Sequence, residues 1–142
     1  MARKKAYEEK IVKLILIKDG TYGLEKDLTI TYPLFIHGAG QDKTILQGCG
    51  IQIAGTKEEK KRVDMQGMTI KGSSLQGLYA IGGLSFLCTR MTFTQCGEEG
   101  VAARSTKGRL INCAITQCGW SGIYSGENAL IELEGDQTKV DG

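Results

Sequence analysis

A repeat in the second half of the chain constrains its fold more than any other feature. The segments that begin at Met68, Met91 and Cys113 read MTIKGSSLQGLYA, MTFTQCGEEGVAA and CAITQCGWSGIYS. Their apolar and glycine positions align with a period of 23 and then 22 residues. A period in this range is typical of a solenoid, in which each coil buries its apolar face only against its neighbours.

The alignment predicts which side chains form the core. Two apolar ladders are expected to stack from coil to coil at a spacing of about 4.8 Å. They contain Ile70, Phe93 and Ile115 in one case, and Leu78, Val101 and Ile123 in the other. The residues that alternate with the first ladder are predicted to face outward, and they are Thr69, Lys71, Thr92, Thr94, Ala114 and Thr116.

Short strands separated by glycine corners predict an all-β fold. The chain contains 20 glycines and a single proline, Pro33, which suits a backbone that turns every few residues. The Leu-x-x-Leu-x-Leu pattern of leucine-rich repeats is absent, and strands this short exclude most helical repeats. We therefore predict a single-stranded parallel β-helix, a solenoid of about six coils.

The 142 residues are expected to form one domain. Residues 1–10 are polar and rich in helix formers, and we predict a short capping helix there. Residues 11–62 are assigned to the first coils, with the charged run 56–62 as a solvated loop between coils. Residues 63–142 are assigned to the regular coils.

Two segments resemble a known superfamily. The stretch ILIKDGTYGLEKDLTITYPLFIHGAGQDKTILQG, residues 15–48, looks like the first coils of right-handed β-helix proteins of the pectin lyase-like superfamily. The stretch GRLINCAITQCGWSGIYS, residues 108–125, is similar to the superfamily's repeat, in which an asparagine such as Asn112 occupies a tight corner. The resemblance implies a right-handed β-helix. Because the superfamily contains lyases, hydrolases, esterases, tailspikes and non-catalytic modules, it does not choose an activity.

No catalytic constellation is predicted. Glycoside hydrolysis needs convergent carboxylates, and none of the predicted outward positions is acidic. The only histidine, His37, is interpreted as a corner or surface residue, and Asp64, Glu98 and Glu99 as solvated corner charges. The sequence contains no Cys-x-x-Cys pair and no histidine beside a cysteine, so a zinc site is not predicted. We therefore expect no metal and no cofactor.

Ligand binding is predicted at a few exposed side chains. Tyr79 and Tyr124 occupy equivalent outward positions in different coils, and Trp120 follows a glycine at a corner. Exposed aromatic rings on such a ladder could stack against sugar rings; covering a seam between coils, or a subunit contact, is the alternative use. The predicted ligand-binding residues are Tyr79, Trp120, Tyr124, Thr92, Thr94 and Thr116.

The leading functional hypothesis is a non-catalytic β-helix module that binds polysaccharide or protein through a lateral face. The alternatives are a polysaccharide lyase or glycoside hydrolase, whole or as a fragment, and a purely structural assembly protein. No cap is seen for the last coil, so we expect either a homo-oligomer or a fragment of a longer chain. The net charge of +2 gives no argument for nucleic acid or a membrane surface as partner.

The cysteines bear on the compartment. Five is an odd number, so at least one thiol has no partner within the chain. Cys96 and Cys118 occupy the same slot in FTQCG and ITQCG, within disulfide range, but free buried thiols are the favoured state. No export signal is seen. These features favour a reducing compartment such as the cytoplasm.

Overall fold

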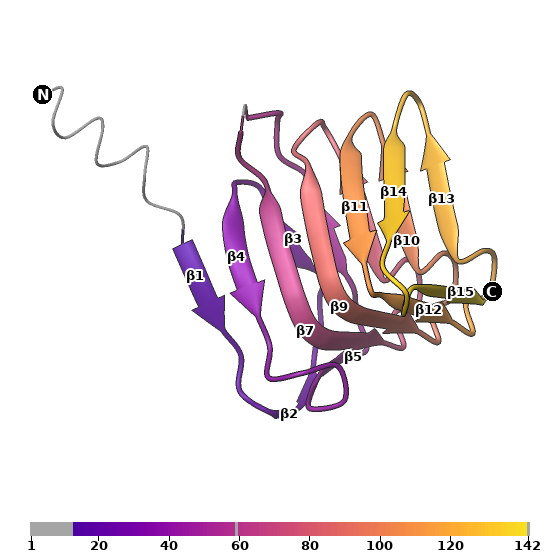
Figure 1. Cartoon of the computed structure of the whole chain (residues 1–142). Coiled ribbons are helices and arrows are strands. Elements are labelled where there is room, and N and C mark those ends of the chain that lie inside the picture. The colour runs from indigo at the N-terminus through magenta and orange to yellow at the C-terminus, as the bar shows by residue number, and fades with distance from the viewer. Residues whose placement is uncertain (1–12, 59, 142) are drawn as a thin grey trace, which may run out of the picture.

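The chain forms a solenoid of parallel β-strands (Figure 1). The structure is a computed structural model that describes residues 13–58 and 60–141. All regular elements in these residues are strands, which confirms the predicted all-β parallel β-helix. The predicted capping helix at residues 1–10 lies outside the described residues.

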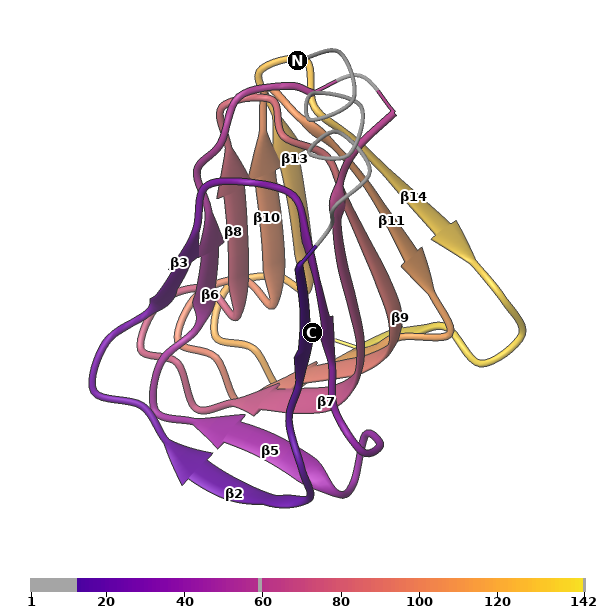
Figure 2. The same ribbon diagram turned by 90° about the vertical axis from the view of Figure 1, so that its left-hand side faces the viewer.

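The strands stack into three faces around a triangular core (Figure 2). The first face contains β1 (Lys13–Leu16), β4 (Leu34–His37), the first halves of β7 (Val63–Lys71) and β9 (Phe86–Thr94), β11 (Lys107–Ile111) and β14 (Leu130–Glu134). The second contains β2 (Gly20–Gly23), β5 (Thr44–Gln47), the second halves of β7 and β9, β12 (Ala114–Thr116) and β15 (Lys139–Asp141). The third contains β3 (Leu28–Ile30), β6 (Ile51–Ile53), β8 (Leu78–Ile81), β10 (Val101–Arg104) and β13 (Ile123–Gly126).

Left-handed backbone conformations turn the chain between the first and second faces. Gly67 (φ 72°), Arg90 (φ 49°) and Asn112 (φ 52°) occupy this corner in successive coils. Asparagine tolerates the left-handed region better than most residues. The side chain of Asn112 also accepts a hydrogen bond at Oδ1 from the backbone N–H of Gln137 at 3.1 Å, which ties the corner to the next coil.

Strand register confirms the predicted core ladders. Ile70 pairs with Phe93, Phe93 pairs with Ile115, and all three side chains are fully buried. The second ladder pairs Leu78 with Val101 and Val101 with Ile123 in the same way. Each rung therefore packs on the coils before and after it, as a solenoid requires.

One connection is longer than its equivalents in the other regular coils. The chain passes from the third face to the first through residues 54–62, whereas later coils use residues 82–85, 105–106 and 127–129. We name residues 54–62 the insertion loop; the structure describes all of them except residue 59, and the first part of the loop packs on the following coil. Thr56 bridges to Gly83, and the N–H of Leu84 donates to the carbonyl of Gly55 at 3.0 Å. The predicted loop is therefore in place, and it forms a wall beside the next coil.

Candidate functional site

The three predicted aromatic residues line one groove. Tyr79 on β8 and Tyr124 on β13 both align with Ala102 on β10, which lies between them on the third face. Trp120 lies in the turn before β13 and is 69% exposed. The groove has a volume of about 350 Å³. We name it the aromatic groove; its lining residues are Gln76, Tyr79, Glu98, Glu99, Ala102, Arg104, Trp120 and Tyr124.

Strand register sets the spacing of the two tyrosines. They lie two rungs apart, so their Cα atoms are separated by roughly 9.6 Å. The residue between them is the small, buried Ala102. Only a methyl group lies between the bases of the two rings, and at 2% exposure it is covered by its surroundings.

Arg104 fixes one side of the groove. Its Nη1 donates to Glu127 Oε1 at 2.9 Å, and its guanidinium carbon lies 5.4 Å from the centre of the Tyr124 ring. The hydroxyls of Tyr124 and Tyr79, followed by the carboxylate of Glu127, raise the pKa of Arg104 above its usual value. The guanidinium therefore remains a charged donor beside the aromatic rings.

Two carboxylates share one hydrogen-bond donor at the other side of the aromatic groove. The side-chain amide of Gln76 donates to Glu98 Oε1 at 3.0 Å and to Glu99 Oε1 at 3.2 Å. Glu99 is only 7% exposed, so its interpretation as a solvated corner charge is wrong. Its buried carboxylate is satisfied by the amide, as a charged group at this depth requires. The remaining oxygens are acceptors next to the aromatic rings.

The structure places the predicted threonines elsewhere. Thr92, Thr94 and Thr116 lie on the second face, in β9 and β12, away from the sheet that carries the tyrosines. Thr92 Oγ1 accepts a hydrogen bond from Gln41 Nε2 at 3.0 Å, and the hydroxyls of Thr94 and Thr116 are 2.9 Å apart. The six predicted binding residues therefore divide into two groups, and hydroxyls of the threonine group already have protein partners.

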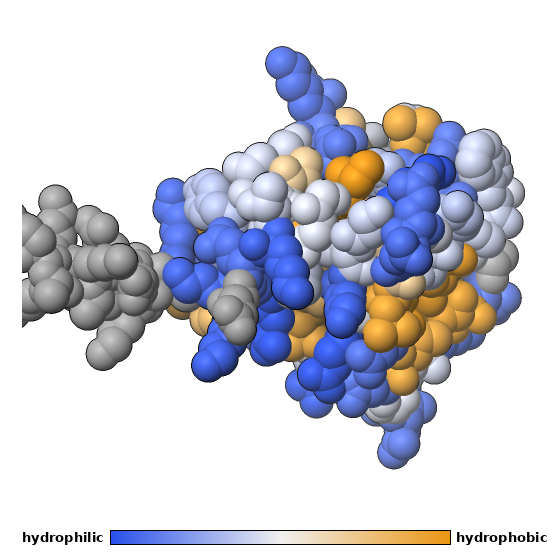
Figure 3. All heavy atoms as spheres, turned by 90° about the horizontal axis from the view of Figure 1, so that it is seen from above, coloured by the Kyte–Doolittle hydropathy of each residue, from blue (hydrophilic) through white to orange (hydrophobic). Residues whose placement is uncertain are grey.

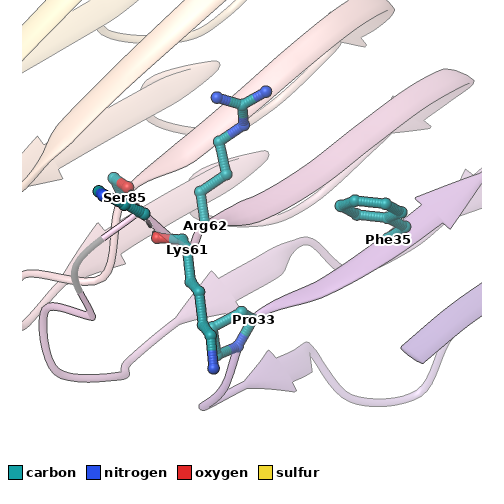
Figure 4. A pocket seen from close by; sticks show the side chains of 6 residues that line it. Pro33, Phe35, Lys61, Arg62 and Ser85 are labelled. Carbon is teal, nitrogen blue, oxygen red and sulfur yellow. Dashed lines mark hydrogen bonds between the residues drawn. The ribbon is translucent and has the colours of Figure 1, made fainter. Parts of the chain in front are cut away.

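A second hollow lies at the corner between the third and first faces (Figure 4). It has a volume of about 330 Å³ and is lined by Pro33, Phe35, Lys60, Lys61, Arg62 and Ser85. Figure 4 shows Lys61 reaching toward Pro33 while Arg62 extends in the opposite direction. Ser85 Oγ donates to the carbonyl of Lys61 at 3.4 Å. Basic side chains thus dominate this hollow, in contrast to the aromatic groove.

The only histidine lies beside this hollow. His37 Nε2 is 3.7 Å from Asp64 Oδ1 and 2.9 Å from Gln66 Nε2, and its ring stacks on Phe35. The Asp64 side chain is 14% exposed, so its interpretation as a solvated corner charge is also wrong. Its Oδ1 has no hydrogen-bond partner among the described residues. One histidine with one carboxylate does not supply the carboxylate pair that glycoside hydrolysis uses.

The described residues contain neither a cluster of metal ligands nor a helix of membrane-spanning length. Across residues 13–58 and 60–141, no three His, Cys, Asp or Glu side chains are grouped so as to hold a metal ion. In those residues no helix is long and apolar enough to span a membrane.

A family comparison agrees with this geometry. The family described as a right-handed beta helix region matches residues 49–138. The chain belongs to the right-handed β-helix family. The pectin lyase-like resemblance of the sequence is consistent with that membership. Searches of curated proteins and of solved structures gave no significant match.

Sequence reasoning placed the aromatic side chains of this β-helix protein on the outer surface, but it interpreted their neighbours Glu98 and Glu99 as corner charges and did not include Gln76. Gln76 and Glu99 are separated by one period of the repeat, 23 residues. Both lie inside the aligned repeat segments, directly before the aligned glycines Gly77 and Gly100, so the repeat itself places them in neighbouring coils at equivalent positions. The position of Arg104 is also predictable from the repeat. It lies two residues after Ala102 in β10, so the two side chains are on the same outward side of the strand.

Proposed function

We propose that this β-helix protein is a binding module that holds a polysaccharide in the aromatic groove. The observation that carries the proposal is the convergence of Tyr79, Trp120 and Tyr124 on one groove. Aromatic rings offer flat apolar surfaces to the C–H faces of sugars, and a few placed polar groups then fix orientation.

The polar lining suits sugar hydroxyls. Glu98 and Glu99 accept hydrogen bonds, Arg104 donates them, and Gln76 holds the two carboxylates in place. The groove crosses coils along the side of the solenoid, and an extended lateral surface is how solenoids commonly engage long ligands. A chain-like ligand could therefore contact several coils at once.

A glycan array followed by calorimetry tests the proposal. A neutral or charged oligosaccharide selected on the array is expected to bind with a dissociation constant between about 1 μM and 1 mM. Trp120→Ala should weaken that binding about tenfold, because the exposed ring contributes stacking area and little to the fold. Tyr32→Ala is the matched control, since Tyr32 is 48% exposed outside the groove. Equal effects of the two substitutions would reject the groove as the site.

Self-association is a second candidate, favoured by the exposed end of the ladders. Ile131 aligns with Gly108 and Leu133 with Leu110, so these two residues of β14, rather than Leu130, face the interior. Leu133 is nevertheless 48% exposed. A second copy packed on this last rung would cover it. Sedimentation over a concentration series should then show a dimer that Leu133→Glu abolishes, whereas a monomer at every concentration would reject this candidate.

A further inference from the structure

The insertion loop forms one wall of a pocket that is separate from the aromatic groove. The pocket has a volume of about 270 Å³, close to the lower size of small-molecule sites. Lys57 and Lys60 line it from the loop, and Lys107 and Asn128 line it from later coils. Figure 3 views this side of the molecule from above, with hydrophilic side chains over the loops and hydrophobic surface toward the C-terminal coils.

The wall is held against the body of the solenoid. Gly83 lies in the left-handed region at φ 105°, and a Cβ added there would be 3.2 Å from the backbone nitrogen of Lys57. Glycine therefore permits the close approach of loop and coil. Insertions in repeat proteins commonly project on the binding face, and here the insertion encloses a pocket instead of extending into solvent.

The described residues that line the pocket carry an excess of positive charge. Its described lining has three ammonium groups, on Lys57, Lys60 and Lys107, and one carboxylate, on Glu58, which leaves a net charge of +2. The ion pairs among the described residues involve arginines and His37, and none involves these three lysines. A concave surface lined by like charges concentrates the potential that attracts an anion.

The hydroxyls of the pocket add acceptors. Ser85 Oγ donates its proton to the carbonyl of Lys61 at 3.4 Å, and Ser105 Oγ donates to the carbonyl of Glu127 at 3.0 Å. Each hydroxyl oxygen keeps a lone pair that can accept a hydrogen bond. The pocket therefore offers cationic donors together with neutral acceptors, a combination that fits a ligand with an anionic group and hydroxyls of its own.

We propose that this pocket binds the phosphate monoester of a small polyhydroxy molecule. A phosphate monoester carries about −1.5 to −2 charges at neutral pH and three acceptor oxygens, which matches the net charge of the lining. The lysines and the Asn128 amide donate to the phosphate, and hydroxyls of the ligand donate to Ser85 and Ser105. A carboxylate would supply only one charge and would leave part of the cationic lining unneutralised.

Calorimetry with the full chain tests this assignment at low ionic strength. The probes are glucose 6-phosphate, inorganic phosphate and glucose. We expect glucose 6-phosphate to bind at least tenfold more tightly than glucose and more tightly than inorganic phosphate, with an affinity that falls as salt rises. Lys107→Gln should weaken binding about tenfold, the effect of losing one charge-assisted hydrogen bond.

Two further variants distinguish this pocket from general attraction to a basic protein. Glu58→Gln removes the one described negative charge of the lining and should tighten binding. Lys139→Gln changes the net charge of the chain as Lys107→Gln does, but on β15, outside the pocket lining, and should leave affinity unchanged. The proposal is overturned if glucose binds as well as its phosphate, if inorganic phosphate binds as well as the ester, or if both lysine variants behave alike. Trp120→Ala should not affect this binding, so the result is independent of the aromatic groove.

Discussion

Gly108→Ala is expected to destabilise the solenoid because the position has no room for a methyl group. Gly108 pairs with Phe86 on the neighbouring coil, and a Cβ there would lie within 3.0 Å of three carbons of the Phe86 ring. Overpacking a rigid core of this kind costs about 1–3 kcal/mol. With a urea m-value of roughly 1–3 kcal/mol/M, a loss of about 2 kcal/mol lowers the unfolding midpoint by about 1 M. Urea unfolding followed by circular dichroism measures the shift.

Two matched substitutions decide whether the ring is the cause. At Gly23 a Cβ would meet no atom within 4 Å, so Gly23→Ala should instead stabilise the chain by about 0.4–1 kcal/mol through the unfolded state. In a Phe86→Leu background, the cost of Gly108→Ala should fall by about 1 kcal/mol, since the side chain that causes the clash is gone. The reasoning is refuted if Gly108→Ala behaves like Gly23→Ala, or costs the same in both backgrounds.

Three further predictions concern the core, the thiols and a corner. Phe93→Ala should cost about 3–5 kcal/mol in urea unfolding because the ring is fully buried between two rungs; a cost below about 1 kcal/mol would contradict the ladder. Burial raises the pKa of Cys96 to about 12, so the half-buried Cys49 should react first with a thiol reagent. The stability that the raised pKa of Cys96 contributes is complete below the usual thiol range and is lost as pH rises toward about 12, which unfolding at a series of alkaline pH values would reveal. Asn112→Ala should lower the free energy of unfolding by about 1–2 kcal/mol, because Ala tolerates the left-handed backbone less well and the N–H of Gln137 loses its acceptor. An unchanged free energy of unfolding would show that the Asn112 side chain does not stabilise this corner.

The core of this β-helix protein was predictable because apolar residues recur in the sequence at the period of one coil. Ile70, Phe93 and Ile115 repeat at the spacing of one coil, and the strands place them in one register. The same period also aligned Tyr79 with Tyr124. The pattern held wherever one residue type had to occupy the same position in successive coils, because stacking imposes the same packing on each rung.

The candidate site was less predictable because the residue type at its polar positions changes from coil to coil. Glu99 is buried and accepts a hydrogen bond from Gln76 of the previous coil. Two adjacent glutamates at a turn usually indicate side chains that are exposed to solvent. Thr92 has a partner in Gln41, which a loop brings from two coils away. The length of the insertion loop was visible in the sequence, but its packing on Gly83 depends on a close backbone approach that composition does not reveal.

The most direct test of the proposed function uses the single tryptophan of the chain, Trp120, as a reporter. Because this side chain lies at the groove and is 69% exposed, an oligosaccharide that stacks there should change its fluorescence and shift the emission to the blue. We predict a saturable change whose midpoint matches the calorimetric affinity and moves to higher concentration in Tyr79→Ala. Calorimetric binding of the sugar with no change in Trp120 emission would contradict the account, because the ligand would then occupy some other surface.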